Sequence, residues 1–147
     1  MILKKALLIG TLLISTLFSS AVAHPRTAAD VERDLTKAAK TSVAIYRSNG
    51  MSGLIVKTEE CYKNLDKHQF YCVYLDLASR HIDQDFLAGT NFPPTEFFAD
   101  EQFGARVGPV FVKTNMDMQQ ANAYLAEITP IINKLVDDHL RKNKVGP

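Results

Sequence analysis

The chain of 147 residues carries 17 basic and 16 acidic side chains, a formal net charge of +1, and 46% of its residues are hydrophobic. A chain of this length can form a real core within one domain. The sequence has no basic stripe, so we expect no nucleic-acid partner. No apolar run after the N-terminal segment is long enough to span a membrane, so we expect no stable membrane anchor.

The first 23 residues have the layout of a secretory signal peptide. Two lysines precede an uncharged run over residues 6–18, and Ala21-Val22-Ala23 supplies the small residues that a signal peptidase accepts. The run is shorter than the roughly 20 residues of a membrane-spanning helix. We predict that residues 1–23 are cleaved, and that residues 24–147 form a single soluble helical domain in the periplasm or outside a bacterial cell.

Two helices are predicted in the first part of the mature chain. Thr27 and Asp30 form a capping pair, and apolar residues then recur at spacings of three and four over residues 31–46 and again over residues 51–65. Ser48-Asn49-Gly50 is typical of a helix end and predicts a break between the two helices.

Cys61 and Cys72 are the only cysteines, and in an exported protein an even number favours a disulfide. A redox-active pair usually has the C-x-x-C spacing, which is absent here. Eleven residues of one straight helix would separate the two Cα atoms by roughly 16 Å, whereas a disulfide needs less than about 7 Å. We therefore predict a structural disulfide that joins two helices of a hairpin, with the turn at residues 64–68.

Residues 69–88 predict a third helix, which lies in the centre of the fold. Its apolar residues cover most of the circumference, as in a buried helix, and Gly89 is expected to end it. A strand over residues 70–75 is the alternative, because the composition there is rich in aromatic residues.

Glycines and prolines divide the next segment, residues 89–112. A short helix is expected to begin near Pro94 or Thr95 and to end at Gly104. Gly108-Pro109 predicts a break in regular structure, so residues 110–112 are either extended or a helical turn.

The last predicted helix follows Thr114 and Asp117, which have the spacing of a capping pair. Pro130 interrupts its pattern, so that the helix either kinks there or restarts with Thr129 as its cap. The chain as a whole predicts an all-α fold of about five helices.

Four polar residues of the central helix are candidates for a site. Asp76 and Arg80 stand four residues apart and can pair, as can His81 and Asp85. Two side chains are too few for a metal site, and we expect neither a metal nor a cofactor. For Asp76 a partly buried ion pair or a cap for a neighbouring loop is the simpler interpretation. For His81 and Asp85 it is a solvated helix end, and a small hydrolase that uses His81 and nearby carboxylates is the alternative.

The segment from Phe92 to Phe103 combines four phenylalanines with three carboxylates. Phenylalanines are what a small core without tryptophan would use, but exposed aromatic residues mark partner sites. If these rings are exposed, the candidate residues for binding a partner are Phe92, Phe97, Phe98, Glu101 and Phe103.

No compact catalytic signature occurs: the sequence lacks the zinc-protease, nucleophile-elbow, phosphate-loop and haem-attachment motifs. We therefore expect a protein-binding module of the cell envelope, such as an inhibitor, immunity protein or adaptor, whose partner is another envelope or secreted protein. The alternative is a small-molecule carrier with a pocket lined by Tyr71, Tyr74 and Asp76. As an exported, helical protein with a disulfide and without an obvious catalytic motif, the chain is similar in outline to some periplasmic immunity proteins that neutralise secreted cell-wall amidases. No individual motif of those proteins is matched.

Overall fold

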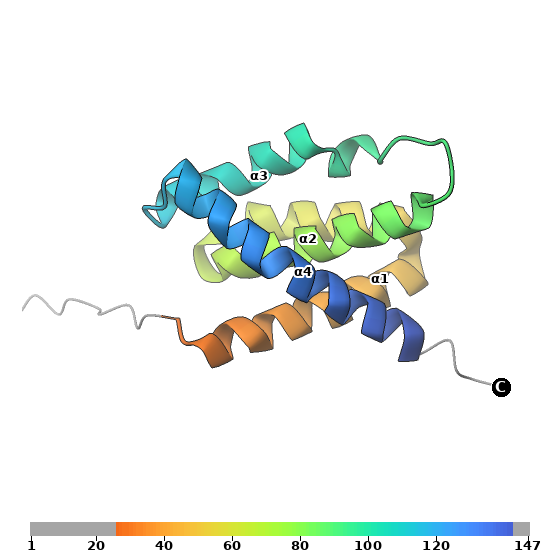
Figure 1. Cartoon of the computed structure of the whole chain (residues 1–147), viewed down its shortest axis with the longest axis horizontal. Helices are drawn as coiled ribbons and strands as arrows, with labels where there is room; N and C mark the ends of the chain where they lie inside the picture. Colours follow the sequence, from red (N-terminus) through yellow and green to blue (C-terminus); the bar gives the residue numbers. More distant parts are fainter. Residues whose placement is uncertain (1–25, 143–147) are drawn as a thin grey trace, which may run out of the picture.

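The computed structural model describes residues 26–142, apart from the side chains of residues 66–68. This part of the chain forms four α-helices and one 3₁₀ turn (Figure 1), namely α1 (Ala28–Lys63), α2 (Leu65–Leu87), η1 (Glu96–Phe98), α3 (Asp100–Lys113) and α4 (Met118–Lys142). The all-α prediction is confirmed. The two strand alternatives are wrong, because residues 70–75 and 110–112 are helical.

The predicted leader, residues 1–23, lies outside the described residues. Among the helices that are described, none is both long enough and apolar enough to cross a membrane.

Helix α1 joins the first two predicted helices through a kink. Its start is the predicted capping box: the Thr27 hydroxyl accepts from the Asp30 backbone N–H at 3.1 Å, and the Asp30 carboxylate accepts from the Thr27 N–H at 3.1 Å. Gly50 has φ +63° and ψ −161°, which is not helical. The backbone therefore changes direction at the glycine that the sequence marks, since only glycine adopts this conformation without steric cost.

The turn of the helical hairpin is tighter than predicted. Only Asn64 separates α1 from α2, and residues 65–68 already belong to α2. The Asn64 side chain donates to the Glu60 carbonyl at 2.9 Å, and its backbone N–H donates to the Cys61 carbonyl at 3.1 Å. These bonds satisfy carbonyls at the end of α1, so the chain can reverse at once. The predicted Cys61–Cys72 disulfide is present, with the Cα atoms 5.5 Å apart.

Helix α3 continues through the two sites at which the sequence predicts a break. Gly104 does not end it, and Gly108 and Pro109 both lie inside it. Val107 and Val110 on the same helix are buried in the core. Packing of this apolar face outweighs the low helix propensity of the glycines and the proline, as tertiary contacts often do.

Helix α4 is capped by Asp117 and Gln120, and not by the predicted pair of Thr114 and Asp117. Asp117 and Gln120 cap it reciprocally, each side chain accepting from the backbone N–H of the other at 2.8 and 2.9 Å. Thr114 instead closes α3, because its hydroxyl donates to two carbonyls of the last turn. Pro130 lies within α4, and Thr129 does not cap a new helix but donates to the Leu125 carbonyl at 2.6 Å.

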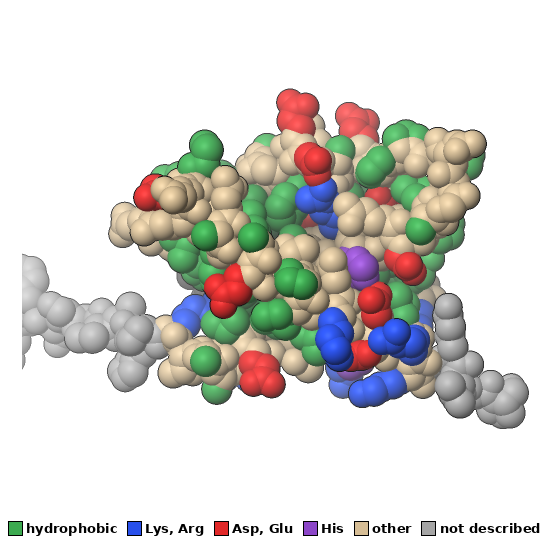
Figure 2. Space-filling view, in the orientation of Figure 1, with side chains coloured by type: hydrophobic (Ala, Val, Ile, Leu, Met, Phe, Trp, Pro, Cys, Tyr) green, Lys and Arg blue, Asp and Glu red, His purple; other side chains and the backbone are tan. Residues whose placement is uncertain are grey.

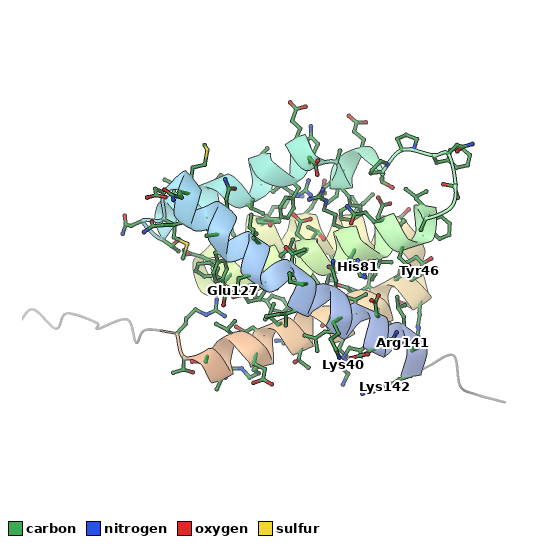
Figure 3. The ribbon with its side chains drawn as sticks, viewed as in Figure 1. Lys40, Tyr46, His81, Glu127, Arg141 and Lys142 are labelled. Atoms are coloured by element: carbon green, nitrogen blue, oxygen red, sulfur yellow. A yellow bond between two sulfur atoms is a disulfide. The ribbon has the colours of Figure 1, made fainter. Side chains whose placement is uncertain are left out.

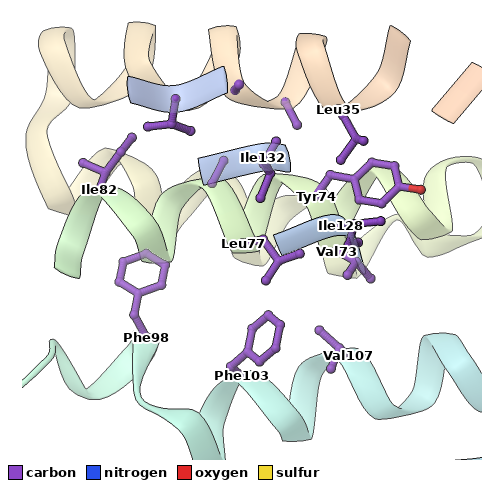
Figure 4. Packing of buried hydrophobic residues seen from close by; sticks show 14 of the residues in the cluster. Leu35, Val73, Tyr74, Leu77, Ile82, Phe98, Phe103, Val107, Ile128 and Ile132 are labelled. Atoms are coloured by element: carbon purple, nitrogen blue, oxygen red, sulfur yellow. The ribbon is translucent and has the colours of Figure 1, made fainter. Parts of the chain in front are cut away.

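Helix α2 is the centre of the molecule, as predicted. Residues 72–79 are buried without interruption, and α1, α3 and α4 all pack on this helix. Figure 4 shows α2 side chains between Leu35 of α1, Ile128 and Ile132 of α4, and Phe103 of α3. Helix α3 packs on α2 and η1, and it approaches α4 at few points, one of which is the edge-on contact of the Phe111 and Tyr124 rings.

Candidate functional site

A wedge-shaped cleft separates α3 from α4, with α2 as its floor. The two helices diverge from the turn at residues 114–117 (Figure 1), and the surface between them is hollowed, with hydrophobic and basic side chains inside (Figure 2). Two cavities of about 610 and 500 Å³ lie here and share Arg80, Phe103 and Leu125. We call this continuous hollow the α3–α4 cleft.

The narrow end of the cleft is apolar. Val107 and Phe111 line the wall formed by α3, and Ala121 lines the wall formed by α4. At the rim, Val112 is 73% exposed and Met118 is 81% exposed. Large exposed hydrophobic side chains beside an apolar hollow are typical of a surface that another molecule covers.

Two glycines expose the backbone of α3 to the cleft. Gly104 and Gly108 both line it and are one helical turn apart. A Cβ atom built on either residue would meet nothing within 4 Å. The wall at these positions is therefore bare backbone next to open space, which permits close approach of a ligand.

Arg80 lies where the two cavities meet. Its guanidinium pairs with Asp100 of α3 and lies 5.0 Å from the centre of the Phe103 ring. The arginine side chain is 21% exposed, whereas that of Asp100 is 90% exposed. The Arg80 Nε–H is buried and has no hydrogen-bond acceptor among the described groups. Burial lowers the pKa of Arg80, because the guanidinium loses water that its contacts with the protein do not fully replace.

A buried ion pair fixes α3 to α2 below the cleft. Arg106 donates to both oxygens of the fully buried Asp76, at 2.8 and 3.0 Å, and to the Phe97 carbonyl at 2.7 Å. The predicted pairing of Asp76 with Arg80 is therefore wrong. Arg106 stands three residues after Phe103 and four before Val110, on the apolar stripe of α3. A charged residue at such a position indicates a buried ion pair, and it is the sequence signal that identifies Arg106 as the partner of Asp76.

Burial dominates the electrostatics of this pair. It raises the pKa of Asp76, while the hydrogen bonds and charge of Arg106 lower it. The Tyr62 hydroxyl of α1 is also buried, and burial together with the nearby Asp76 charge raises the pKa of Tyr62. That hydroxyl nevertheless meets hydrogen-bond geometry with no described group. The carboxylate is thus held mainly by one arginine.

The wide end of the cleft is lined by polar and apolar side chains in equal number. His81 Nε2 lies 2.8 Å from Asp137 Oδ1 of α4, so the predicted pairing of His81 with Asp85 is wrong. Thr129 supplies the one hydroxyl side chain that lines this cavity, and it is bonded to the Leu125 carbonyl. The histidine and aspartate orient each other across two helices, but the geometry does not place the Thr129 hydroxyl ready for activation.

The remaining carboxylates of α2 have separate surroundings. Asp83 is buried and accepts from both the backbone N–H and the hydroxyl of Thr95, which fixes the loop before η1. Asp85 is exposed and lines another hollow beside Phe86. Within residues 26–142, no group of three or more His, Cys, Asp or Glu side chains is placed to hold a metal ion.

The phenylalanine segment does not form one recognition surface. Phe98 and Phe103 are buried in the core, and Phe97 is half-buried with the Arg106 guanidinium 3.8 Å from its ring centre. Phe92 and Glu101 are exposed. Phe103 also lines the α3–α4 cleft from the wall formed by α3, so the structure separates the predicted binding residues into core, cleft wall and surface.

The pocket predicted for a small-molecule carrier stays a prediction. None of the four cavities described for residues 26–142 is lined by Tyr71, Tyr74 or Asp76. The Tyr74 hydroxyl is instead hydrogen-bonded to the Tyr124 hydroxyl of α4.

The last turn of α4 carries three basic residues, His139, Arg141 and Lys142, of which the last two are labelled in Figure 3. Arg47 of α1 donates to the Leu140 carbonyl at 3.2 Å, near the carboxyl end of the helix. Cations there are favoured by the helix dipole and by unpaired carbonyls. This cluster therefore has a structural explanation.

No protein-family model matches the chain, and no curated protein or solved structure is significantly similar to it. Among the features described above, the α3–α4 cleft is the one whose shape and chemistry point to a ligand.

Proposed function

We propose that this protein is an exported binding module of the bacterial cell envelope and that its α3–α4 cleft receives a segment of another protein. It would act as an inhibitor, an immunity protein or an adaptor. The observation that carries the proposal is the open apolar cleft, with bare backbone at Gly104 and Gly108 and exposed side chains at Val112 and Met118.

The proposed location rests on two features. The predicted leader gives the export signal. The Cys61–Cys72 disulfide is compatible with an oxidising compartment, where such bonds form and persist. Both features support a site of action outside the cytoplasm.

The shape of the cleft favours a protein over a small molecule. Small-molecule sites bury roughly 70–90% of the ligand surface, whereas this cleft is open on one face of the molecule (Figure 2). A small ligand inside the cavity would cover only part of Val112 and Met118, which line it at the rim. A protein segment laid along the cleft would cover both, which removes more apolar surface from water.

The frame around the cleft supports binding without a large rearrangement. Arg106 and Asp76 join α3 to α2, and the disulfide joins α2 to α1. A site that is already rigid loses less conformational entropy when the partner binds. Rigid walls also explain why α3 and α4 can stay apart at the open end.

The proposal is tested by photo-cross-linking in cells that produce the protein. A benzophenone amino acid is placed at Val112, on the rim of the cleft, or at Val56, an exposed valine of α1 that serves as the matched control. We expect one discrete protein adduct from position 112 and none of that size from position 56.

A second variant shows whether the adduct depends on the cleft. Gly104→Leu projects a side chain into open space and fills the cleft, whereas Ala44→Leu adds the same side chain to an exposed position of α1. The adduct should disappear with Gly104→Leu and remain with Ala44→Leu. An adduct that survives Gly104→Leu, or that forms equally from both valine positions, would overturn the proposal.

A further inference from the structure

We infer that the partner segment is an amphipathic α-helix that carries a carboxylate side chain, and that this carboxylate replaces Asp100 on Arg80. The inference rests on the proposed function and specifies the chemistry of the partner. It follows from the two walls of the cleft and from the asymmetry of one ion pair.

The walls of the cleft suit a helix. Small residues line both walls of its narrow end, namely Gly104 and Gly108 on α3 and Ala121 on α4. Helices pack at interaxial distances of about 8–10 Å, and the smallest side chains permit the closest approach. A segment that binds by β-strand addition would instead need a sheet edge to pair with its backbone, and residues 26–142 contain no strand.

The apolar residues of the two walls suit the apolar face of such a helix. Phe103, Val107 and Phe111 recur at spacings of four along α3 and line the cleft from one side. On the opposite side α4 contributes Leu125. A partner helix with apolar residues at spacings of three and four would place them between these two rows.

Arg80 supplies the charge that selects the partner. It is fixed in the floor by burial and by its contact with the Phe103 ring, and its Nε–H has no acceptor. Its present partner, Asp100, extends from the rim of α3 and remains 90% exposed. An arginine binds a carboxylate best through two parallel N–H···O bonds, and exposed ion pairs contribute little free energy. A carboxylate shielded from water by a docked helix is therefore a stronger partner for Arg80 than Asp100.

The test uses a phage-displayed library of random peptides of about 20 residues, a length sufficient for a helix. Peptides are selected on the wild-type protein and counter-selected on Gly104→Leu, which retains only those that need the open cleft. We expect the selected sequences to combine an i, i+3, i+4, i+7 apolar pattern with an Asp or Glu. The corresponding synthetic peptides should become helical when bound, as measured by circular dichroism.

The role of the carboxylate is measured by a double-mutant cycle between protein and peptide. Arg80→Gln, and Glu→Gln or Asp→Asn in the peptide, should each weaken binding by about tenfold or more, and the two changes together should cost little more than either alone. Asp100→Asn should tighten binding several-fold, because it removes the competitor. Lys134→Gln, which removes an exposed cation outside the cleft, should leave the affinity within about twofold.

The outcomes separate this inference from the proposed function. Extended peptides, peptides without a carboxylate, or an affinity unchanged by Arg80→Gln would overturn the inference, while a cleft-dependent adduct from position 112 would leave the proposed function standing. Failure to select any peptide that needs the open cleft would also count against the inference. Loss of binding in Arg80→Gln together with a lower midpoint of thermal unfolding would indicate damage to the fold. Arg80→Lys then decides between the two explanations. Lysine keeps the positive charge but lacks the planar guanidinium, so this variant should fold and still bind the peptide more weakly than the wild type.

Discussion

Arg106 of α3 donates to both carboxylate oxygens of Asp76 on α2, and both groups lie below the surface of the molecule. This pair holds α3 to the central helix from one side only. The other side of α3 makes few contacts with α4, so the α3–α4 cleft stays open beside a firmly attached wall.

Removing the arginine should be costly because it leaves a buried, unpaired carboxylate. We expect Arg106→Leu to lower the free energy of unfolding by roughly 3–5 kcal/mol, the usual cost of breaking a buried ion pair. Replacing both partners, as Asp76→Leu with Arg106→Met, should recover much of the loss. Urea denaturation measures both variants. A loss below about 1 kcal/mol for Arg106→Leu would show that the pair contributes little.

The phenylalanines should separate into two groups by stability. Phe98→Ala should cost about 3–5 kcal/mol, because it leaves a cavity in the core. Phe92 is 75% exposed, and Phe92→Ala should change stability by less than about 0.5 kcal/mol. Thermal unfolding of the two variants compares them directly, and similar losses would contradict the burial that separates these rings.

The disulfide should stabilise the hairpin mainly through the unfolded chain. In the chain-entropy model, closing a loop of this size contributes about 3 kcal/mol. Replacing Cys61 and Cys72 together by Ala should lower the free energy of unfolding by about that amount, with the helical circular dichroism signal retained. A helical signal that collapses without denaturant would show that the bond is required for folding rather than for stability alone.

Local sequence signals predicted most of the fold. The Thr27 capping box and the glycine at the α1 kink depend on neighbours within a few residues, so their patterns are visible in the sequence. The continuation of α3 through Gly108 and Pro109 depends on the burial of Val107 and Val110 against other helices. Packing of that kind is set by the whole fold and could not be read from local propensity.

The candidate site was predictable only in part. The spacing of four residues suggested that Arg80 and Asp85 were the partners of Asp76 and His81, but the true partners are 30 and 56 positions away, on α3 and α4. A pairing between distant helices leaves no mark in local spacing. The cleft itself depends on how α3 and α4 diverge, which no local pattern encodes.

The free energy of unfolding should decrease at acid pH, and we call this part of the pH profile the acid limb. Hydrogen bonding to Thr27 lowers the pKa of Asp30 to about 2, and hydrogen bonding to Lys134 lowers that of Asp138 to about 2. Their ordinary pKa is 3.8, so their stabilising contribution is complete above that pH and is lost as the pH falls toward 2. Asp76 acts in the opposite sense: because burial raises its pKa, its contribution declines as the pH rises above 3.8.

Urea titrations at pH 2 to 6 check these signs. The double variant with Asp30→Asn and Asp138→Asn should lose less stability between pH 4 and pH 2 than the wild type does. An identical acid limb in the two proteins would show that other carboxylates cause it.

The most direct test of the cleft as the binding surface is a titration calorimetry series with the partner identified by cross-linking at position 112. Gly104→Ala adds a methyl group to open space and should stabilise α3 by about 0.5–1 kcal/mol, which shows that the fold tolerates the site. Gly104→Leu should then weaken partner binding by about tenfold or more, while Ala44→Leu should leave it within about twofold. An affinity equal for Gly104→Leu and Ala44→Leu would contradict the account.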